Sequence, residues 1–434
     1  MKSLLKKIVP FWFIILYQRF VLFANSLKYN TFIILLRVPP FRVFYRKICN
    51  SKSYISTRFT CVEEVMERYP SKIKILEQSN KELVFATPIF WDQPKMNDYL
   101  QEGRRKNSYS AIFSDVTIIG GSNVTVFANS ISLYDLKCFD KNNKYKYSDL
   151  GIKYYNNHDC LVYYENINLK IDSAISIVCN YSWNYYHYFY EGLVKLIALE
   201  ELNIDIDIPI IVDEICLKIP QFKELLTILN SKKRQIITLL PKTSVFVKNL
   251  YYISCPNIIP PNFINENNIK PSDVLYDKQI IYKLREAILP HSSGKEFFKN
   301  IFISRSLSKS TRKYNEDDVF NVLQNFGFQK ICPEQLSIAD QIALFNNANC
   351  IVGASGAAFT NLLFCKPTCK IVILTKKNIP ISCFSSISTI VGSQLRYVTE
   401  DEMQIKKGKM SIHDSFYITP EKIKSATSTW LIES

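Results

Sequence analysis

The sequence Cys350-Ile-Val-Gly-Ala-Ser-Gly-Ala-Ala-Phe-Thr-Asn361 joins a short apolar run to a helical pattern through a turn of small residues. This pattern is typical of a buried strand followed by a helix, the unit from which parallel α/β sheets are built. Small residues let anionic groups approach the backbone, and the first N–H groups of a helix attract negative charge. The turn is neither G-x-G-x-x-G nor a P-loop, and tight strand-to-helix packing explains it equally well.

Strands and helices alternate on both sides of this turn. Strands are predicted at 300–304, 328–331 and 370–374, and helices begin near Asn315 and at 338. The pattern predicts a doubly wound α/β domain over 271–400, in which ligands bind at the carboxyl ends of the strands.

A basic loop leaves the predicted strand 300–304. It carries Arg305 and Arg312, with Lys309 and Lys313 nearby. Arginine side chains match the oxygens of a diphosphate, although a basic loop is also commonly just a solvated surface. Its place after a parallel strand favours a ligand site.

The region before this domain has a different pattern at its start. Residues 115–135 alternate between apolar and polar and include the turn Gly120-Gly-Ser-Asn123, which predicts a β-meander. Strands alternate with helices after residue 174, so we predict a second α/β domain over 61–270. A Pro- and Asn-rich stretch at 256–271 is interpreted as the linker, and a helix in the tail, 401–434, is expected to return to the first domain.

The segment Asn184-Tyr-Tyr-His-Tyr-Phe-Tyr-Glu191 opens the helix predicted at 186–202. His187 and Glu191 are four residues apart and therefore lie on one helix face. A histidine near neutrality can take a proton from a hydroxyl group, but a pair at this spacing is more often structural than catalytic.

The net charge of +15 is concentrated at the N-terminus of this 434-residue chain. Residues 1–60 carry 11 bases and no acid, whereas the remainder carries 43 bases and 39 acids. Because this arm is also strongly apolar, we expect an amphipathic anchor on the cytoplasmic face of an anionic membrane, and nucleic acid is not needed as a partner. Arg19 interrupts the first apolar run and disfavours a full span; a signal peptide or packing on the protein's own core are the alternatives.

The overall composition, with 47% hydrophobic and 21% charged residues, excludes a disordered or collagen-like chain. The 12 cysteines are scattered from Cys49 to Cys383 without a C-x-x-C motif. Neither a disulfide framework nor a zinc site has the required spacing, so we predict reduced, mostly buried thiols in a cytoplasmic protein.

The sequence resembles glycosyltransferase family 61 over roughly residues 110–375. The shared residues are Asn184-Tyr-Tyr-His187, Glu191-Gly-Leu and Leu196; Ile303-Ser-Arg305, Arg312 and Asn315-Glu316; Gly327-Phe328, Pro333-Glu334, Leu336-Ser337, Gln341 and Leu344-Phe345; and Ala348, Gly353, Gly356-Ala357, Thr360-Asn361 and Leu363-Phe364. The resemblance implies a GT-B fold, with two Rossmann-like domains facing across a cleft. It also implies inverting, metal-independent transfer of a sugar from a nucleotide donor, as in capsular and lipopolysaccharide synthesis.

The resemblance also assigns roles to particular residues. His187 is expected to be the general base, with Glu191 orienting it or holding the acceptor. The expected donor-binding residues are Arg305, Arg312, Asn315, Ser355, Gly356, Ala357 and Asn361, and Asn184 and Tyr186 are expected on the acceptor side. No metal or cofactor is expected, and Asp205-Ile-Asp207 is interpreted as a loop because it precedes a strand.

This chain departs from the family at two positions. Ser355 stands where family members often have histidine, and Ile373 where glutamate is common. These departures leave open whether nucleoside recognition has changed, or whether the chain is a catalytically inactive membrane-bound scaffold.

A serine hydrolase is the other alternative. Gly353-Ala-Ser355-Gly-Ala nearly matches the G-x-S-x-G elbow, and Asp401 and His413 follow in the order of a hydrolase triad. Ala357 stands in place of the last glycine, and this interpretation leaves the motifs at 184–196 and 303–316 unexplained.

Overall fold

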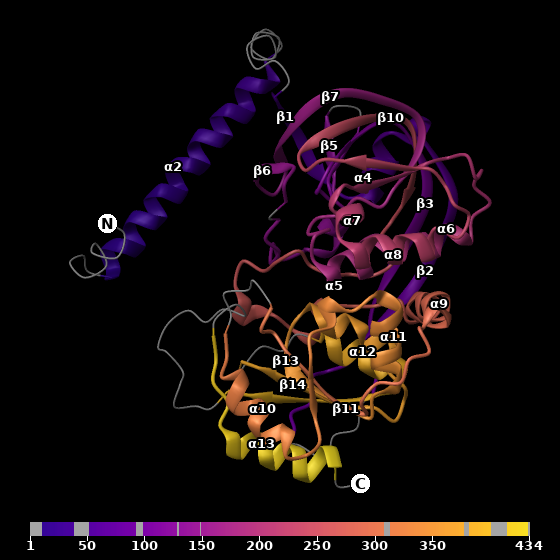
Figure 1. Ribbon diagram of the computed structural model, residues 1–434. Helices are drawn as coiled ribbons and strands as arrows, with labels where there is room; N and C mark the ends of the chain where they lie inside the picture. Colours follow the sequence, from indigo (N-terminus) through magenta and orange to yellow (C-terminus); the bar gives the residue numbers. More distant parts are fainter. Residues whose placement is uncertain are drawn as a thin grey trace.

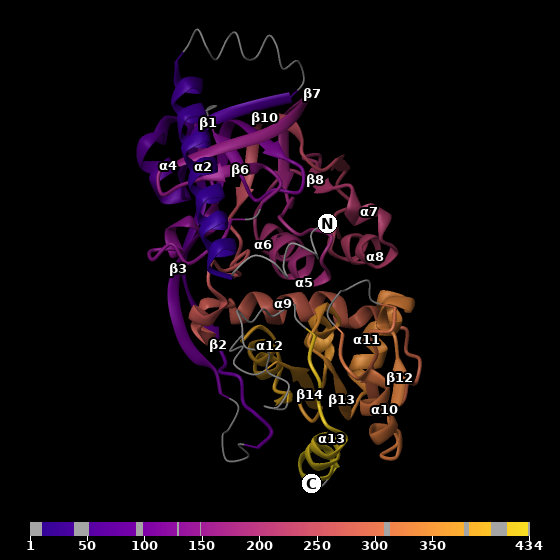
Figure 2. The same ribbon diagram turned by 90° about the vertical axis from the view of Figure 1, so that its left-hand side faces the viewer.

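The computed structural model describes residues 11–38, 52–92, 99–127, 130–147, 149–307, 313–376, 382–400 and 415–432. The protein is a mixed α/β structure with two sheets, one in each half of the molecule (Figure 1). Helix α9 (Lys278–Ile288) lies between the halves and contacts helices of both (Figure 2).

The first sheet has ten strands and mixed directions. Its main order is β1-β5-β4-β3-β10-β7-β8-β9, with β2 on β3 and β6 on β7. The strands are β1 (Lys52–Thr60), β2 (Ile73–Phe85), β3 (Gln101–Ile119), β4 (Thr125–Phe127), β5 (Ile131–Leu133), β6 (Ile152–Tyr155), β7 (Asp159–Ser176), β8 (Ile210–Asp213), β9 (Ile236–Leu239) and β10 (Thr243–Ile253).

Only part of the first sheet follows the predicted α/β pattern. The neighbours β10, β7, β8 and β9 are parallel, as the alternation of strands and helices predicts. The antiparallel pairs of β3 with β4 and β4 with β5 confirm the predicted meander. Since β2, β3 and the meander extend the parallel strands in an antiparallel manner, the first half is not a regular doubly wound domain.

The helices of the first half follow strands of the first sheet. They are α4 (Val62–Arg68), α5 (Tyr185–His187), the π-helical turn η3 (Tyr188–Leu193), α6 (Val194–Glu200), α7 (Ile215–Lys218) and α8 (Pro220–Leu229). The helix predicted at 186–202 is therefore α5, η3 and α6 in succession.

The second sheet is parallel throughout. Its order is β12-β11-β13-β14-β15, formed by β11 (Asn300–Ile303), β12 (Gln329–Ile331), β13 (Cys350–Ala354), β14 (Lys370–Thr375) and β15 (Gln394–Thr399). Its helices are α10 (Glu316–Gln324), α11 (Ile338–Asn347), the 3₁₀-helix η8 (Ala357–Phe364) and α12 (Cys383–Val391). Chain order 2-1-3-4-5 is a doubly wound topology, and its switch point lies between β11 and β13.

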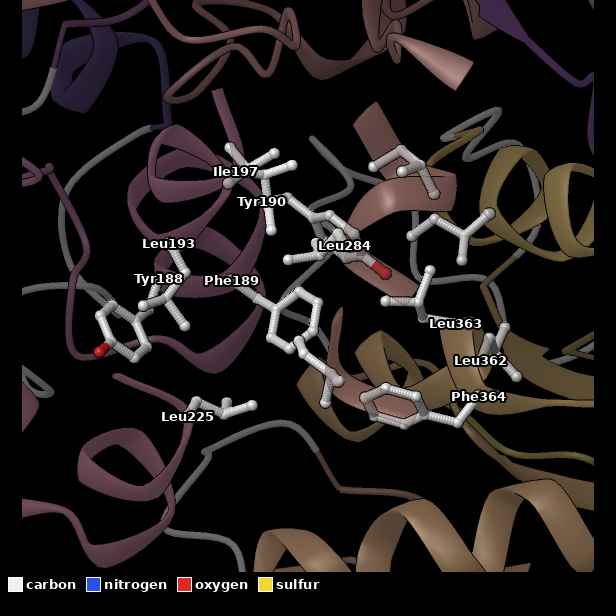
Figure 3. Packing of buried hydrophobic residues seen from close by; sticks show 14 of the residues in the cluster. Tyr188, Phe189, Tyr190, Leu193, Ile197, Leu225, Leu284, Leu362, Leu363 and Phe364 are labelled. Atoms are coloured by element: carbon white, nitrogen blue, oxygen red, sulfur yellow. The ribbon is translucent and has the colours of Figure 1, made fainter. Parts of the chain in front are cut away.

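One hydrophobic core runs through both halves. Aromatic and aliphatic side chains of η3 and α8 pack with Leu284 of α9 and with η8 of the second half (Figure 3). Tyr190 is fully buried and donates a hydrogen bond to the carbonyl oxygen of Thr360 at 3.0 Å. Shared apolar burial of this extent holds the two sheets in a fixed relation.

The chain crosses between the halves near the end of β2. Ala86 exchanges hydrogen bonds with Ser385 and Ser386 of α12, and Ile89 and Trp91 pair with Tyr397 of β15. This segment of the predicted first domain thus completes the edge of the second sheet.

The C-terminal helix α13 (Pro420–Ala426) and the turn η10 (Thr427–Ile432) pack on the second sheet, where Ile423, Ala426 and Leu431 join the cluster around Phe302. The expected return of this helix to the first domain is therefore wrong, because its apolar face is buried against α10 and the strands of the second sheet.

The described part of the N-terminal arm begins with helix α2 (Phe11–Arg37). Its end packs on the first sheet, with Ile33 and Leu36 against Leu161 and Arg37 paired with Asp159. The last nine residues of the predicted arm form β1. Within the described residues, no helix combines the length and apolarity needed to span a membrane.

The start of α11 is capped from the other half of the molecule. The carboxylate of Glu224 in α8 accepts hydrogen bonds from the N–H groups of Ile338 and Ala339 at 2.9 and 3.1 Å.

We predict that Glu224→Ala lowers the free energy of unfolding by about 1–2 kcal/mol, because two N-terminal amides and the helix dipole lose their partner. Urea unfolding measures this loss. Glu214→Ala, which removes only a surface pair with Lys218, is the control and should change little; equal effects would show that the cap is unimportant.

Candidate functional site

A pocket of about 450 Å³ lies at the switch point of the second sheet. The ends of β11 and β13 line one wall through Ser304, Arg305 and Gly356, and Tyr185 of α5 and Phe222 of α8 line the other. The pocket therefore lies between the two halves, where a doubly wound sheet places its ligand.

Among the described residues that line this pocket, Arg305 is the cation. Its guanidinium donates to the carbonyl oxygen of Ser355 at 3.0 Å and lies against Gly356, where an added Cβ would come within 3.9 Å of it. Burial lowers the pKa of Arg305, although a guanidinium stays protonated at neutral pH. A half-buried arginine beside a glycine leaves space for an anion at the same place.

Glu316 holds the backbone that presents Arg305. Its carboxylate accepts hydrogen bonds from the Ser304 hydroxyl at 2.5 Å and from the Arg305 N–H at 2.8 Å, and it pairs with Lys330. Burial alone would raise the pKa of Glu316, but these partners hold it below its usual value. The loop after β11 is therefore tied to the start of α10.

His187 and Glu191 form a direct pair on α5 and η3. Nδ1 of His187 is hydrogen-bonded to Oε1 of Glu191, which is buried, and 17% of the His187 side chain is exposed. A carboxylate at Nδ1 accepts the proton of that nitrogen, so Nε2 carries the free lone pair. This is the arrangement of a general base supported by an acid.

Comparison with known proteins adds a family to this description. The family model described as Glycosyltransferase 61 matches residues 185–372, which include the histidine pair, Arg305 and the small-residue turn. This segment, somewhat less than half of the chain, is similar to glycosyltransferase family 61. No curated protein matches the chain.

The family 61 residues form two sets in the structure. His187 and Glu191 do not line the Arg305 pocket; Tyr185, two residues earlier, does. Positions two apart on a helix point in nearly opposite directions, so α5 presents Tyr185 to the pocket and His187 to the first half.

Four other predicted residues have partners within the protein. Asn184 caps α5 by accepting the N–H of Tyr186, whose hydroxyl is hydrogen-bonded to that of Tyr276. Asn361 is fully buried between the Tyr185 hydroxyl at 2.8 Å and Gln341 at 2.7 Å. The amide of Asn315 is bonded to both backbone groups of Ile418. Each of these side chains positions a neighbouring element.

The small-residue turn contributes Gly356 and Ala357 to the pocket lining. Ser355, which is expected to bind the donor, does not line the pocket, and its N–H donates to the carbonyl oxygen of Leu374 at 2.9 Å. Ile373, the second departure from the family, is fully buried in β14 and does not line the pocket. Arg312 and Lys309 lie outside the described residues.

The structure gives no support to the hydrolase alternative. A nucleophile elbow holds its serine in a strained turn, whereas Ser355 is not among the described residues with positive φ. Asp401 and His413 lie outside the described residues. The Asp205-Ile-Asp207 segment is an exposed loop before β8, as predicted.

Asn123 is a site residue that the sequence did not reveal. Its amide donates to Oε2 of Glu191 at 3.5 Å, its side-chain oxygen accepts the N–H of Asn180 at 2.9 Å, and its own N–H donates to Asp149 at 2.8 Å. The turn Gly120-Gly-Ser-Asn123 thus supports the carboxylate of Glu191. Its composition signals only a hairpin, so no local pattern distinguishes this role.

The backbone is unusual both before and after His187. Tyr181, which precedes it, has a positive φ angle, and a π-helical turn (Tyr188–Leu193) follows it. Tyr181 has φ of 60°, which is rare for a bulky residue, and its ring lies 5.1 Å from the His187 ring. Such a conformation costs about 1–3 kcal/mol and is found mostly at functional sites. The π-helical turn contains Glu191 and Gly192, and a side chain at Gly192 would come within 3.3 Å of the Ile177 carbonyl.

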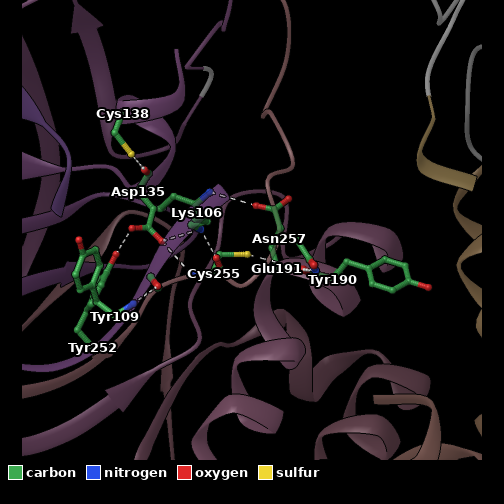
Figure 4. A network of polar contacts seen from close by, with 11 residues as sticks. Lys106, Tyr109, Asp135, Cys138, Tyr190, Glu191, Tyr252, Cys255 and Asn257 are labelled. Atoms are coloured by element: carbon green, nitrogen blue, oxygen red, sulfur yellow. Dashed lines mark hydrogen bonds and ion pairs between the residues drawn. The ribbon is translucent and has the colours of Figure 1, made fainter. Parts of the chain in front are cut away.

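A buried polar network lies behind Glu191 (Figure 4). Lys106 is only 2% exposed; it donates to the Cys255 carbonyl and lies 4.0 Å from Asp135. Asp135 also accepts from the Tyr252 hydroxyl at 2.5 Å and from the Cys255 N–H at 2.8 Å. A cavity of about 50 Å³ between this network and Glu191 is large enough for a few water molecules.

Asp213, at the end of β8, anchors two loops near His187. Burial raises the pKa of its carboxyl to about 6, despite hydrogen bonds from the N–H groups of Gly121 at 2.5 Å and Cys179 at 3.3 Å. A folded-state pKa raised above the unfolded value means that ionisation destabilises the fold. The associated stability is present below about pH 4 and is lost as the pH rises to about 6.

We therefore predict that Asp213→Asn changes the pH dependence of stability. Relative to wild type, the variant should gain about 2–3 kcal/mol of unfolding free energy between pH 4 and pH 7, because the cost of ionising the buried Asp213 carboxyl disappears. Urea unfolding across this range measures the difference, and Asp207→Asn in an exposed loop is the control. A difference that is independent of pH would contradict the raised pKa.

Proposed function

We propose that the protein is an inverting, metal-independent glycosyltransferase. It moves a sugar from a nucleotide-sugar donor to a hydroxyl group of a glycan or lipid-linked saccharide, in surface polysaccharide synthesis. The observation that carries the proposal is the position of Arg305, in a large pocket at the switch point of a doubly wound sheet, within the residues that match family 61.

The pocket fits the donor in size and chemistry. Its volume of about 450 Å³ is in the range of small-molecule sites. The guanidinium of Arg305 would contact the diphosphate, and Gly356 and Ala357 would allow the phosphates to approach the backbone. One wall of the pocket is formed by residues that follow β7, and the other by residues that follow β11 and β13. These walls from both halves support a GT-B arrangement in which the donor lies between two α/β units.

The histidine pair would activate the acceptor. In a single displacement, the acceptor oxygen bonds to the anomeric carbon as the bond to the diphosphate oxygen breaks, so the configuration inverts. The hydroxyl proton passes to Nε2 of His187, and Glu191 stabilises the imidazolium that forms. Tyr185 faces the pocket, whereas His187 faces the first half. We therefore place the donor on one side of α5 and the acceptor on the other. The transferred sugar would extend past the end of α5 to reach the acceptor.

The charge on the departing diphosphate would be balanced by Arg305, without a divalent metal. Fixed donors aimed at developing charge are worth several kcal/mol in a water-poor site. Ser304 and Glu316 hold the Arg305 backbone in place before the donor arrives.

We also propose that the protein lies on the cytoplasmic face of a membrane. Helix α2 packs on the first sheet through Ile33 and Leu36, whereas Leu27 and Ile34 are 59% and 62% exposed, beside Leu35, Val38 and basic residues. An exposed apolar face with neighbouring lysine and arginine fits an anionic lipid surface.

Removal of the base tests the reaction. We expect His187→Ala to lower kcat by about 10²–10⁴-fold, the usual contribution of a general base, with Glu191→Gln giving a smaller loss. The assay uses purified full-length protein with a panel of nucleotide sugars and saccharide acceptors. His158→Ala, an exposed histidine, is the control. Wild-type turnover by His187→Ala would remove the base assignment, and donor binding without any transfer would indicate an inactive scaffold.

Donor recognition gives a second prediction. Arg305→Ala should weaken donor affinity about tenfold to a hundredfold, because a charge-assisted hydrogen bond to phosphate is lost, while Arg305→Lys should recover part of it. Isothermal titration with nucleoside diphosphates measures the change in affinity. Arg285→Ala is the control for loss of an arginine, because the Arg285 side chain donates to a backbone carbonyl in the interior. Addition of Mg²⁺ or Mn²⁺ should leave turnover unchanged; strict dependence on either ion would exclude the metal-free mechanism.

Membrane association depends on the exposed face of α2. We expect Ile34→Ser combined with Leu35→Ser to reduce binding to phosphatidylglycerol-containing vesicles at least tenfold, because each apolar side chain contributes about 1.5–3 kcal/mol when buried in lipid. Vesicle sedimentation measures this, and Ile206→Ser, exposed elsewhere on the first half, is the control. Binding that survives in the double variant would place the anchor elsewhere.

A further inference from the structure

Three potential metal ligands converge on the outer side of the network behind Glu191. The sulfur atoms of Cys61 and Cys138 and a carboxylate oxygen of Glu63 all lie within 4.8 Å of one another. Cys61 connects β1 to α4, Glu63 is in the first turn of α4, and Cys138 lies in the 3₁₀-helix η2 (Asp135–Phe139). All three side chains are half-buried.

The spacing and chemistry of this cluster suit a zinc ion. Ligands at about 2.0–2.3 Å from a tetrahedral zinc lie roughly 3.5–3.8 Å apart, so small side-chain shifts would close the site. Thiolates favour zinc over the hard cations Mg²⁺ and Ca²⁺. Two thiolates and one carboxylate leave a fourth position for water, as in many three-ligand sites.

The carboxylate of Glu63 gives a separate reason to expect a cation. Its Oε2 atom is buried and accepts no N–H or O–H hydrogen bond from the described part of the chain. A buried carboxylate oxygen without such a donor is costly, and a bound cation would remove this cost.

We propose that Cys61, Cys138 and Glu63 bind one zinc ion, with water as the fourth ligand. Both thiols would lose their protons on binding, as zinc ligation requires. None of the three residues lines the Arg305 pocket, so this is a site apart from the proposed transfer reaction, and it does not rest on the proposed function.

The zinc site would stabilise the network behind Glu191. Asp135, in the same 3₁₀-helix as Cys138, accepts hydrogen bonds from the Tyr252 hydroxyl and the Cys255 N–H. Joining η2 to α4 through a metal would fix Asp135, and with it the wall of the cavity that contains Glu191.

Metal content of the purified full-length protein tests the proposal. Protein prepared with reductant and without chelator should contain about one zinc per chain by mass spectrometry. Cobalt replacement should give the charge-transfer absorption of a thiolate-bound ion. Cys61→Ser and Cys138→Ser should each lose the metal, and Glu63→Gln, which keeps both thiols and the side-chain shape, should weaken binding about tenfold or more. Cys383→Ser, at another half-buried cysteine, is the control and should keep the metal.

Several outcomes would overturn the proposal. The first is that reduced, folded wild-type protein takes up neither zinc nor cobalt. The second is that cobalt binds but gives no thiolate charge-transfer absorption. The third is that Cys61 and Cys138 are isolated as a disulfide and still do not bind zinc after reduction. Because metal content is measured without substrate, failure of the zinc site and failure of the proposed transferase activity are separate results. Thermal unfolding with and without added zinc distinguishes a misfolded variant from one that has lost only the metal.

Discussion

The contact between helix α5–η3 of the first half and η8 of the second half is the constraint on which the molecule depends. Buried phenolic hydroxyl groups need hydrogen-bond partners, and Tyr185 and Tyr190 find theirs in Asn361 and in the Thr360 carbonyl. These bonds fix α5 against the carboxyl end of β13. They therefore set both the wall of the Arg305 pocket and the direction in which His187 points.

The second half was largely predictable from sequence, and the reason is physical. Parallel strands buried on both faces read as short apolar runs between helices, so β11, β13 and β14 were recognisable. The switch-point rule then placed Arg305 and Gly356 at one pocket without knowledge of their contacts. In the first half, alternation identified the meander, but neither the pairing of β3 with β10 nor that of β10 with β7, because register between distant strands leaves no local pattern.

The parts of the site that escaped prediction are those formed by long-range contacts between unremarkable residues. Asn123 reads as a turn residue, and only folding brings its amide to Glu191. Cys61 and Cys138 have no motif spacing, and they meet because β1 pairs with β5 and η2 follows β5 directly. Conversely, Asn315 and Asn361 belong to the family pattern, but their side chains bond to other residues of the same chain. A shared motif therefore includes residues that support the site as well as residues that line it.

The continuous core also limits how the site can work. A hinge motion that separated the halves would expose the apolar surface shared by η3, α9 and η8, at about 25 cal/mol for each Å². It would also break the bonds of Tyr185 and Tyr190 and uncap α11 by removing Glu224. Since the ligand's binding energy would have to offset all of these losses, wide opening is unfavourable. In the proposed reaction, donor and acceptor would therefore reach a largely preformed site from two sides of α5, with rearrangement confined to side chains and surface loops.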